Sequence, residues 1–119
     1  MANTSDRDAT IYHNPRCNTS RTVLRMIEES GIAPTVVKYL ETPPSRDALA
    51  KLLDDAGLRP SEAIRRKEPI FAELGLADAD EETLLAAMVA NPILIERPIV
   101  VTGKGTRLAR PAERVNDIL

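Results

Sequence analysis

The sequence predicts a single-domain α/β protein with a mixed β-sheet. Three observations support this fold class: a strand–helix–strand pattern near the N-terminus, a long helical stretch in the middle, and two short strands followed by a helix at the end. A chain of 119 residues has the length of one domain and can bury about two thirds of its unfolded surface. We therefore expect one domain over residues 1–119, with a helical insertion at about residues 45–92.

The N-terminal part has the pattern of a strand, a helix and a second strand. Ala9–His13 reads as the first strand, and Thr35–Leu40, which is rich in β-branched and apolar residues, reads as the second. Between them, an amphipathic helix is expected to run to Ser30, with Thr19 or Ser20 as its N-cap. Such a unit requires parallel strands and a right-handed crossover.

The middle of the chain carries helical patterns and no strand signal. Ser45 is expected to cap a helix that ends at Gly57. The segment Pro60–Asn91 is amphipathic and predicts two or three helices, of which the last begins near Asp80.

The C-terminal part predicts a hairpin and a final helix. Arg97–Thr102 reads as a buried strand, Gly103–Gly105 as a tight turn and Thr106–Ala109 as the returning strand. Pro111 favours the first turn of a last helix over Ala112–Leu119. The complete order, β-α-β, helical insertion, β-β-α, is the thioredoxin-like layout.

Composition excludes several classes of function. The formal net charge is −2 and aromatic residues make up 3% of the chain, so neither a basic surplus nor stacking aromatics points to nucleic acid. No apolar run is long enough to span a membrane, and the polar N-terminus does not look like a signal peptide. The single cysteine favours a reducing compartment. We expect a cytoplasmic protein that binds neither nucleic acid nor membranes.

Cys17 is the candidate reactive group. It lies just after the first strand and just before the first helix, where the helix dipole and unpaired N–H groups stabilise a thiolate. The alternative is an inert, buried sulfur, as in most proteins with one cysteine. A dithiol motif is excluded because Ser20 occupies the second position, and a phosphatase-type loop because Val23 stands where an arginine is needed. Only His13 could join Cys17 as a metal ligand, so no metal site is expected.

Several segments together resemble one family. Tyr12–Cys17 with Ser20-Arg21, then Tyr39–Pro44, Asn91–Val101 and Arg107–Pro111, are similar in order and content to the glutaredoxin-coupled arsenate reductases, in particular to a short arsenate-reductase-like branch. The resemblance covers nearly the whole chain. It implies a thioredoxin-like fold and a cysteine that attacks arsenate or a related oxyanion. Glutathione then adds as co-substrate, glutaredoxin resolves the mixed disulfide, and arsenite leaves without a bound cofactor.

The resemblance also implies roles for individual residues. Cys17 would be the nucleophile, and Arg65, Arg97 and Arg110 would bind the oxyanion. Arg66, next to Arg65, leaves the identity of that third arginine open. His13 and Ser20 would support the thiolate, although a histidine at the end of a strand is often purely structural.

The arginines also make physical sense without the resemblance. Arg97 enters an apolar strand, which is a costly place for a charge unless it faces a ligand or a partner. If Leu108 faces the core, strand alternation places Arg110 on the inner side and Arg107 toward water.

In thioredoxin-like folds the proline before the third strand is usually cis and faces the thiol, so Arg97-Pro98 is expected to be cis.

Two other functions remain open at this point. One is a monothiol, glutathione-linked oxidoreductase with a different substrate. The other is a non-enzymatic adaptor, because some thioredoxin-fold relatives of this family bind RNA polymerase; those regulators typically use a two-cysteine switch, which Ser20 removes here.

Overall fold

The structure is a computed structural model that describes residues 8–119. Residues 1–7 lie outside the described part of the chain, and they include nearly all of the N-terminal segment that does not resemble a signal peptide. The chain forms two compact units. Residues up to Thr42 and Arg97–Leu119 form the first, which we call the sheet unit, and Pro43–Glu96 forms the second, which we call the helical unit.

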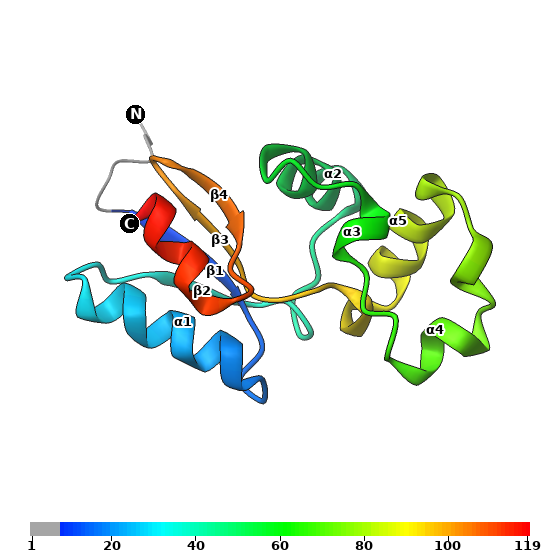
Figure 1. Cartoon of the computed structure of the whole chain (residues 1–119), viewed down its shortest axis with the longest axis horizontal. Helices are drawn as coiled ribbons and strands as arrows, with labels where there is room; N and C mark the ends of the chain where they lie inside the picture. The colour runs from blue at the N-terminus through cyan, green and yellow to red at the C-terminus, as the bar shows by residue number, and fades with distance from the viewer. Residues whose placement is uncertain (1–7) are drawn as a thin grey trace. The chain divides into compact units, whose positions relative to one another are not determined.

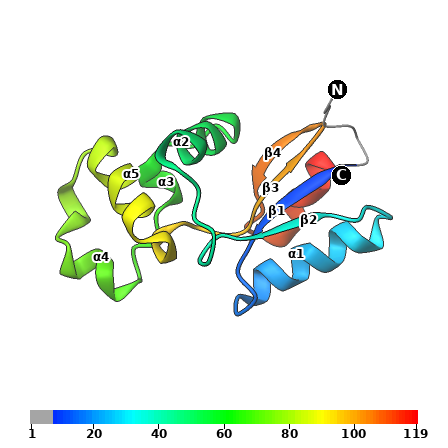
Figure 2. The same ribbon diagram turned by 180° about the vertical axis from the view of Figure 1, so that it is seen from behind.

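The sheet unit contains a four-stranded mixed sheet (Figures 1 and 2). Its strands are β1 (Ala9–His13), β2 (Thr35–Lys38), β3 (Ile99–Thr102) and β4 (Gly105–Leu108), in the order β2-β1-β3-β4. The β1–β2 pair is parallel, and β3 is antiparallel to both β1 and β4. This is the thioredoxin-like arrangement of parallel and antiparallel strands that the sequence predicts.

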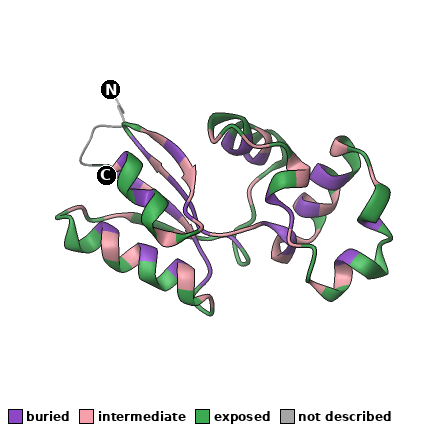
Figure 3. Ribbon diagram, in the orientation of Figure 1, coloured by how far each residue is buried: buried purple, intermediate pink, exposed green. Residues whose placement is uncertain are grey.

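Two helices pack together in the sheet unit, α1 (Asn18–Glu29) and the 3₁₀ helix η3 (Ala112–Ile118) (Figure 1). α1 buries one side, which Figure 3 shows as a periodic stripe. Apolar side chains from the helices and strands form one core: Ala9, Ile11, Val23, Ile27, Val100, Ala109, Val115 and Ile118. Their burial is the main stabilising contribution to this unit.

The helical unit contains α2 (Arg46–Asp55), α3 (Pro60–Ala63), α4 (Pro69–Glu73) and α5 (Glu81–Ala90), with 3₁₀ helices η1 (Leu76–Asp78) and η2 (Pro92–Leu94). As predicted, the Ser45 hydroxyl caps α2 by accepting the Ala48 N–H. The Asp80 carboxylate likewise caps α5 by accepting the Thr83 N–H. Side-chain caps satisfy N–H groups that the first turn of a helix leaves without partners.

Several predicted boundaries are wrong by a few residues. β2 ends at Lys38 instead of Leu40, because the N–H groups of Glu41 and Thr42 both turn back to the Lys38 carbonyl. β3 begins at Ile99, so Arg97 precedes the strand instead of entering it. The last helix is a 3₁₀ helix, the form common in short terminal turns, and Thr102 Oγ1 donates to the Ile118 carbonyl at its end. None of the helices within residues 8–119 is long and apolar enough to cross a membrane.

Candidate active site

The loop that carries Cys17 is built around Asn14. The Asn14 carbonyl accepts the Cys17 N–H at 3.0 Å, and the Asn14 side-chain oxygen accepts the Arg16 N–H at 2.9 Å. Asn14 is 3% exposed, and its bond to the Arg16 N–H is partly buried. They close a tight turn immediately after β1 and fix where the chain enters α1.

Cys17 itself is the N-cap residue of α1. Its backbone is extended, with φ −95° and ψ 123°, and Asn18 is already helical. The prediction that Thr19 or Ser20 caps this helix is therefore wrong. The turn centred on Asn14 uses up the residues before Cys17, so the helix begins earlier than the serine and threonine pattern suggests.

The surroundings of Cys17 favour a thiolate. Partial burial alone would raise the pKa of the thiol. The backbone N–H of Ser20, the side chains of Arg97 and Arg110, and the positive charge of Arg97 outweigh that effect and lower the pKa below its usual value. The thiol is only partly buried, so a reactant can reach the sulfur.

Arg97 and Arg110 converge on the sulfur from either side of the β3–β4 hairpin. Arg110 Nη1 lies 3.8 Å from Cys17 Sγ and also donates to the Arg97 carbonyl at 3.1 Å. The Nε and Nη1 atoms of Arg97 are buried and have no hydrogen-bond partner among the described residues. An unpaired buried donor is costly, which makes Arg97 well suited to a ligand that accepts hydrogen bonds.

Arg97-Pro98 is a cis peptide bond, as predicted. Arg110-Pro111 is a second cis peptide bond, and no sequence pattern predicts it.

His13 and Ser20 form a buried pair behind the loop. His13 Nδ1 lies 2.7 Å from Ser20 Oγ, which also accepts the Asn14 N–H at 3.1 Å. Burial, followed by the charges of Lys38 and Arg21, lowers the pKa of His13 and favours the neutral imidazole. The serine hydroxyl is thus engaged with His13 and Asn14, and it is the Ser20 backbone N–H that acts on the thiol.

Arg65 belongs to the helical unit, whereas the other predicted site residues lie in the sheet unit. Its guanidinium pairs with Glu68 at 3.1 Å and with Glu96 at 2.6 Å. Arg66 is exposed and lies over the ring of Phe71, 5.3 Å from its centre. The role of either arginine in oxyanion binding stays a prediction.

The expected orientation of Arg107 needs correction. In β4 the buried residue is Thr106, followed after the strand by Ala109, and Leu108 is only partly buried. Arg107 does not point freely into water, because its Nε lies 3.6 Å from Asp117 on η3. No local sequence pattern indicates this partner, which lies on a different element.

Two residues organise the loop. Asn14 closes the turn, and Arg21 clamps it from the first turns of α1 by donating to the Pro15 carbonyl at 3.0 Å and to the Asn18 side-chain oxygen. The Asn14-Pro15 pair after the strand predicts a turn here, although not the hydrogen bonds of Asn14. No comparable signal exists for Arg21.

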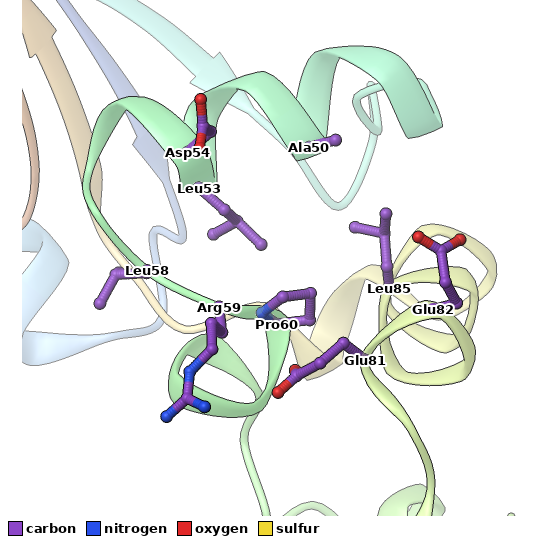
Figure 4. Close-up of a pocket in the computed structure, with 9 residues that line it drawn as sticks. All are labelled: Ala50, Leu53, Asp54, Leu58, Arg59, Pro60, Glu81, Glu82 and Leu85. Atoms are coloured by element: carbon purple, nitrogen blue, oxygen red, sulfur yellow. The ribbon is translucent and has the colours of Figure 1, made fainter.

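Residues 8–119 contain no group of three His, Cys, Asp or Glu side chains placed to hold a metal ion. A pocket of about 250 Å³ lies in the helical unit (Figure 4). Leu53, Leu58 and Leu85 line it together with the acidic side chains of Asp54, Glu81 and Glu82. It holds no thiol or hydroxyl nucleophile, so the chemistry is expected at Cys17.

The arrangement at Cys17 can perform nucleophilic attack on a tetrahedral oxyanion. The thiolate is the attacking group, and the planar guanidiniums of Arg97 and Arg110 suit paired hydrogen bonds to anionic oxygens. With one cysteine in the chain, any two-electron reduction must take its second thiol from another molecule.

Comparison with known proteins agrees with this chemistry. The arsenate reductase of Rhizobium meliloti (strain 1021) is 57% identical over 112 residues, covering 92% of this chain and 80% of the relative. An arsenate reductase of Escherichia coli is 54% identical over the same length, covering 92% and 79%. Among solved structures, an arsenate reductase from Vibrio cholerae superposes with a TM-score of 0.90 at 44% identity, covering 99% of this chain and 100% of the other.

The ArsC family itself matches residues 12–118, which include Cys17 and the arginines on both sides of the hairpin. With nearly the whole described chain matched, the protein belongs to the ArsC family.

Proposed function

We propose that this protein reduces arsenate to arsenite with Cys17 as its nucleophile. The observation that carries the proposal is the partly buried Cys17 sulfur, 3.8 Å from the Arg110 guanidinium and beside the buried, uncommitted donors of Arg97. Membership in a family whose relatives are named arsenate reductases supports arsenate as the oxyanion.

The proposed reaction balances with two external thiols. The Cys17 thiolate displaces one oxygen of arsenate, which leaves as water after protonation, and forms a sulfur–arsenic bond. Glutathione, the proposed co-substrate, then adds to arsenic. Two electrons pass from two thiols to arsenic(V), giving arsenite and one disulfide, and glutaredoxin is the proposed partner that returns Cys17 to the thiol state.

The side chains around Cys17 have separate tasks in this scheme. Arg97 and Arg110 would hold the anionic oxygens and stabilise the charge that builds up as the sulfur attacks. Arg65 is proposed as a third oxyanion contact, and His13 with Ser20 would keep the loop in the conformation that lowers the thiol pKa. No metal or prosthetic group is needed, since the thiols supply the electrons.

A coupled assay tests the proposal. Purified protein with arsenate, glutathione, glutaredoxin and the enzyme that reduces oxidised glutathione should consume NADPH in proportion to arsenite formed. Cys17→Ser should abolish turnover, because a serine hydroxyl is not ionised at neutral pH. Wild type that reduces no arsenate but still exchanges with glutathione would point instead to a monothiol reductase of another substrate. Absence of both activities would favour the adaptor.

We also propose that the protein is cytoplasmic. Both of its units are proposed to form one cooperative domain, with the helical unit as an insertion. The helical unit leaves the sheet unit after Thr42 and returns at Arg97. A single unfolding transition that is the same by near- and far-ultraviolet circular dichroism is expected. Two separate transitions would show two domains.

A further inference from the structure

Two exposed cations beside the thiol loop have no place in the scheme above. They are Arg21 on α1 and Lys38 at the end of β2. Neither has a carboxylate within 4 Å among residues 8–119, and neither approaches the sulfur in the way Arg97 and Arg110 do. Unpaired cations beside a reactive centre raise the local concentration of anions.

Arg21 is held in place. Its guanidinium donates to the Pro15 carbonyl at 3.0 Å and to the side chain of Asn18, which lie on either side of Cys17 in the sequence. Its backbone N–H is bonded to the Cys17 carbonyl at 3.0 Å. A guanidinium has five donor hydrogens, and the two contacts leave the others for a ligand. Less side-chain entropy is lost on binding to a group that is already fixed.

Lys38 lies at the end of the sheet from which the thiol loop leaves β1. It is aligned with His13 in the parallel β1–β2 pair, so it stands beside the residue from which the thiol loop leaves β1. Burial and then the charges of Lys38 and Arg21 lower the pKa of the His13 imidazole. The carboxyl ends of parallel strands are where α/β proteins commonly bind ligands. Glu41, in the turn that follows, forms no ion pair with Lys38.

We infer that Arg21 and Lys38 form a binding site for the carboxylates of the thiol co-substrate, a tripeptide thiol of the glutathione type. The inference rests on the proposed function for its biological meaning. Glutathione carries its thiol between two terminal carboxylates and one ammonium, so it has a net negative charge and can present carboxylates while its sulfur approaches Cys17. Arg97 and Arg110, which contact the Cys17 sulfur, are left to the arsenic oxyanion.

The test compares a charged with an uncharged disulfide, both of which react with the Cys17 thiol, and it needs no arsenate. We would measure the rate constant for reaction of Cys17 with glutathione disulfide and with hydroxyethyl disulfide, and take their ratio. In the double variant Arg21→Gln and Lys38→Gln this ratio should fall about 5- to 10-fold, because each exposed charge pair contributes a modest amount. High salt should lower the wild-type ratio by a similar factor.

Arg25→Gln is the matched control, since Arg25 is an exposed cation one helical turn beyond Arg21 with no ion pair among the described residues. It should leave the ratio unchanged. The loss of Arg21 could disturb the loop, so Lys38→Gln is also measured alone, because Lys38 makes no side-chain hydrogen bond there. Lys38→Gln should lower the ratio about 2- to 3-fold. An unchanged ratio in both variants, or an equal fall in Arg25→Gln, would overturn the inference.

The arsenate assay separates this inference from the proposed function. If wild type reduces arsenate and the variants keep the wild-type KM for glutathione, the carboxylate site is wrong and the reductase stands. If wild type reduces no arsenate while the disulfide ratio responds as expected, the site is supported and arsenate is the wrong substrate.

Discussion

The two units of this protein treat their positive charges differently. Four of the six cations of the helical unit have a carboxylate partner, and Arg66 and Lys67 are the two for which none is found within residues 8–119. The pairs are Arg46 with Glu82, Lys51 with Asp55, Arg59 with Glu62, and Arg65 with Glu68 and Glu96. Around the thiol of the sheet unit, Arg16, Arg21, Lys38 and Arg97 have no such partner within residues 8–119. A cation in an ion pair is largely neutralised by its carboxylate, whereas a cation without such a partner still attracts external anions.

Burial makes this difference sharper. Arg97 is the extreme case, since two of its donor atoms are buried and bonded to nothing in the described part of the protein. Arg65 is also largely buried, with 19% of its side chain exposed, yet both its neighbours are carboxylates. Buried donors that have no partner reduce stability unless a ligand accepts their hydrogen bonds. The contrast supports the proposal that Arg97 binds the oxyanion, and it shows that Arg65 forms ion pairs within the helical unit.

The largest expected effect is on activity in the sheet unit. Arg97→Ala or Arg110→Ala should lower kcat/KM for arsenate roughly 10- to 100-fold, because each removes a charge-assisted contact worth about 1.5–3 kcal/mol. Steady-state kinetics in the coupled assay measures this. Arg114→Ala is the control, because Arg114 is exposed on η3 and forms no ion pair among the described residues. Arg107 is a poorer control, since its loss also releases Asp117. Wild-type kinetics in both variants would remove the arginines from the site.

Sequence patterns predicted the parts of this protein that local chemistry determines. β1 and the helices capped by Ser45 and Asp80 follow from apolar periodicity and capping residues, and the structure confirms them. Arg97 could be suspected because a charge in an apolar segment needs a reason. The start of α1 was predicted wrongly, because the hydrogen bonds of the Asn14 turn place Cys17, and not a serine or threonine, at the N-cap. The partner of Arg107 depends on tertiary packing, which the local pattern does not contain.

A smaller effect, on stability, should have opposite signs in the two units. Arg97→Met removes unpaired buried donors and should stabilise the ligand-free protein by about 1 kcal/mol while it impairs arsenate reduction. Arg65→Met leaves Glu68 and Glu96 without their partner and should destabilise the protein by about 1–2 kcal/mol. Urea unfolding of the wild type and both variants measures the free energies. If both substitutions shift stability in the same direction, the contrast between the two arginines is wrong.

The smallest expected effect is a change in the pH dependence of Cys17. Burial raises the thiol pKa, but the Ser20 N–H and the side chains of Arg97 and Arg110 lower it by more than burial raises it. Alkylation by iodoacetamide should therefore have a midpoint below the usual thiol value of ~8.5. Arg97→Met should move the midpoint upward, because it removes both a hydrogen bond and a positive charge.

Arg65→Met, in the helical unit, should leave the midpoint of alkylation where it is, because Arg65 does not contribute to the pKa of Cys17. The gain in thiolate is limited: at a pKa of ~8.5 about 3% of a thiol is ionised at pH 7, so a lower pKa raises the reactive fraction at most ~30-fold. Because the folded-state pKa is depressed, the associated stabilisation is fully present above the unfolded thiol pKa and is lost as the pH falls through the folded value. The alkylation rate should therefore level off above the folded pKa of Cys17, and the urea midpoint should keep rising from there to the unfolded thiol pKa. A native protein whose Cys17 resists alkylation at every pH would show a buried, inert sulfur and would remove the basis for the whole comparison.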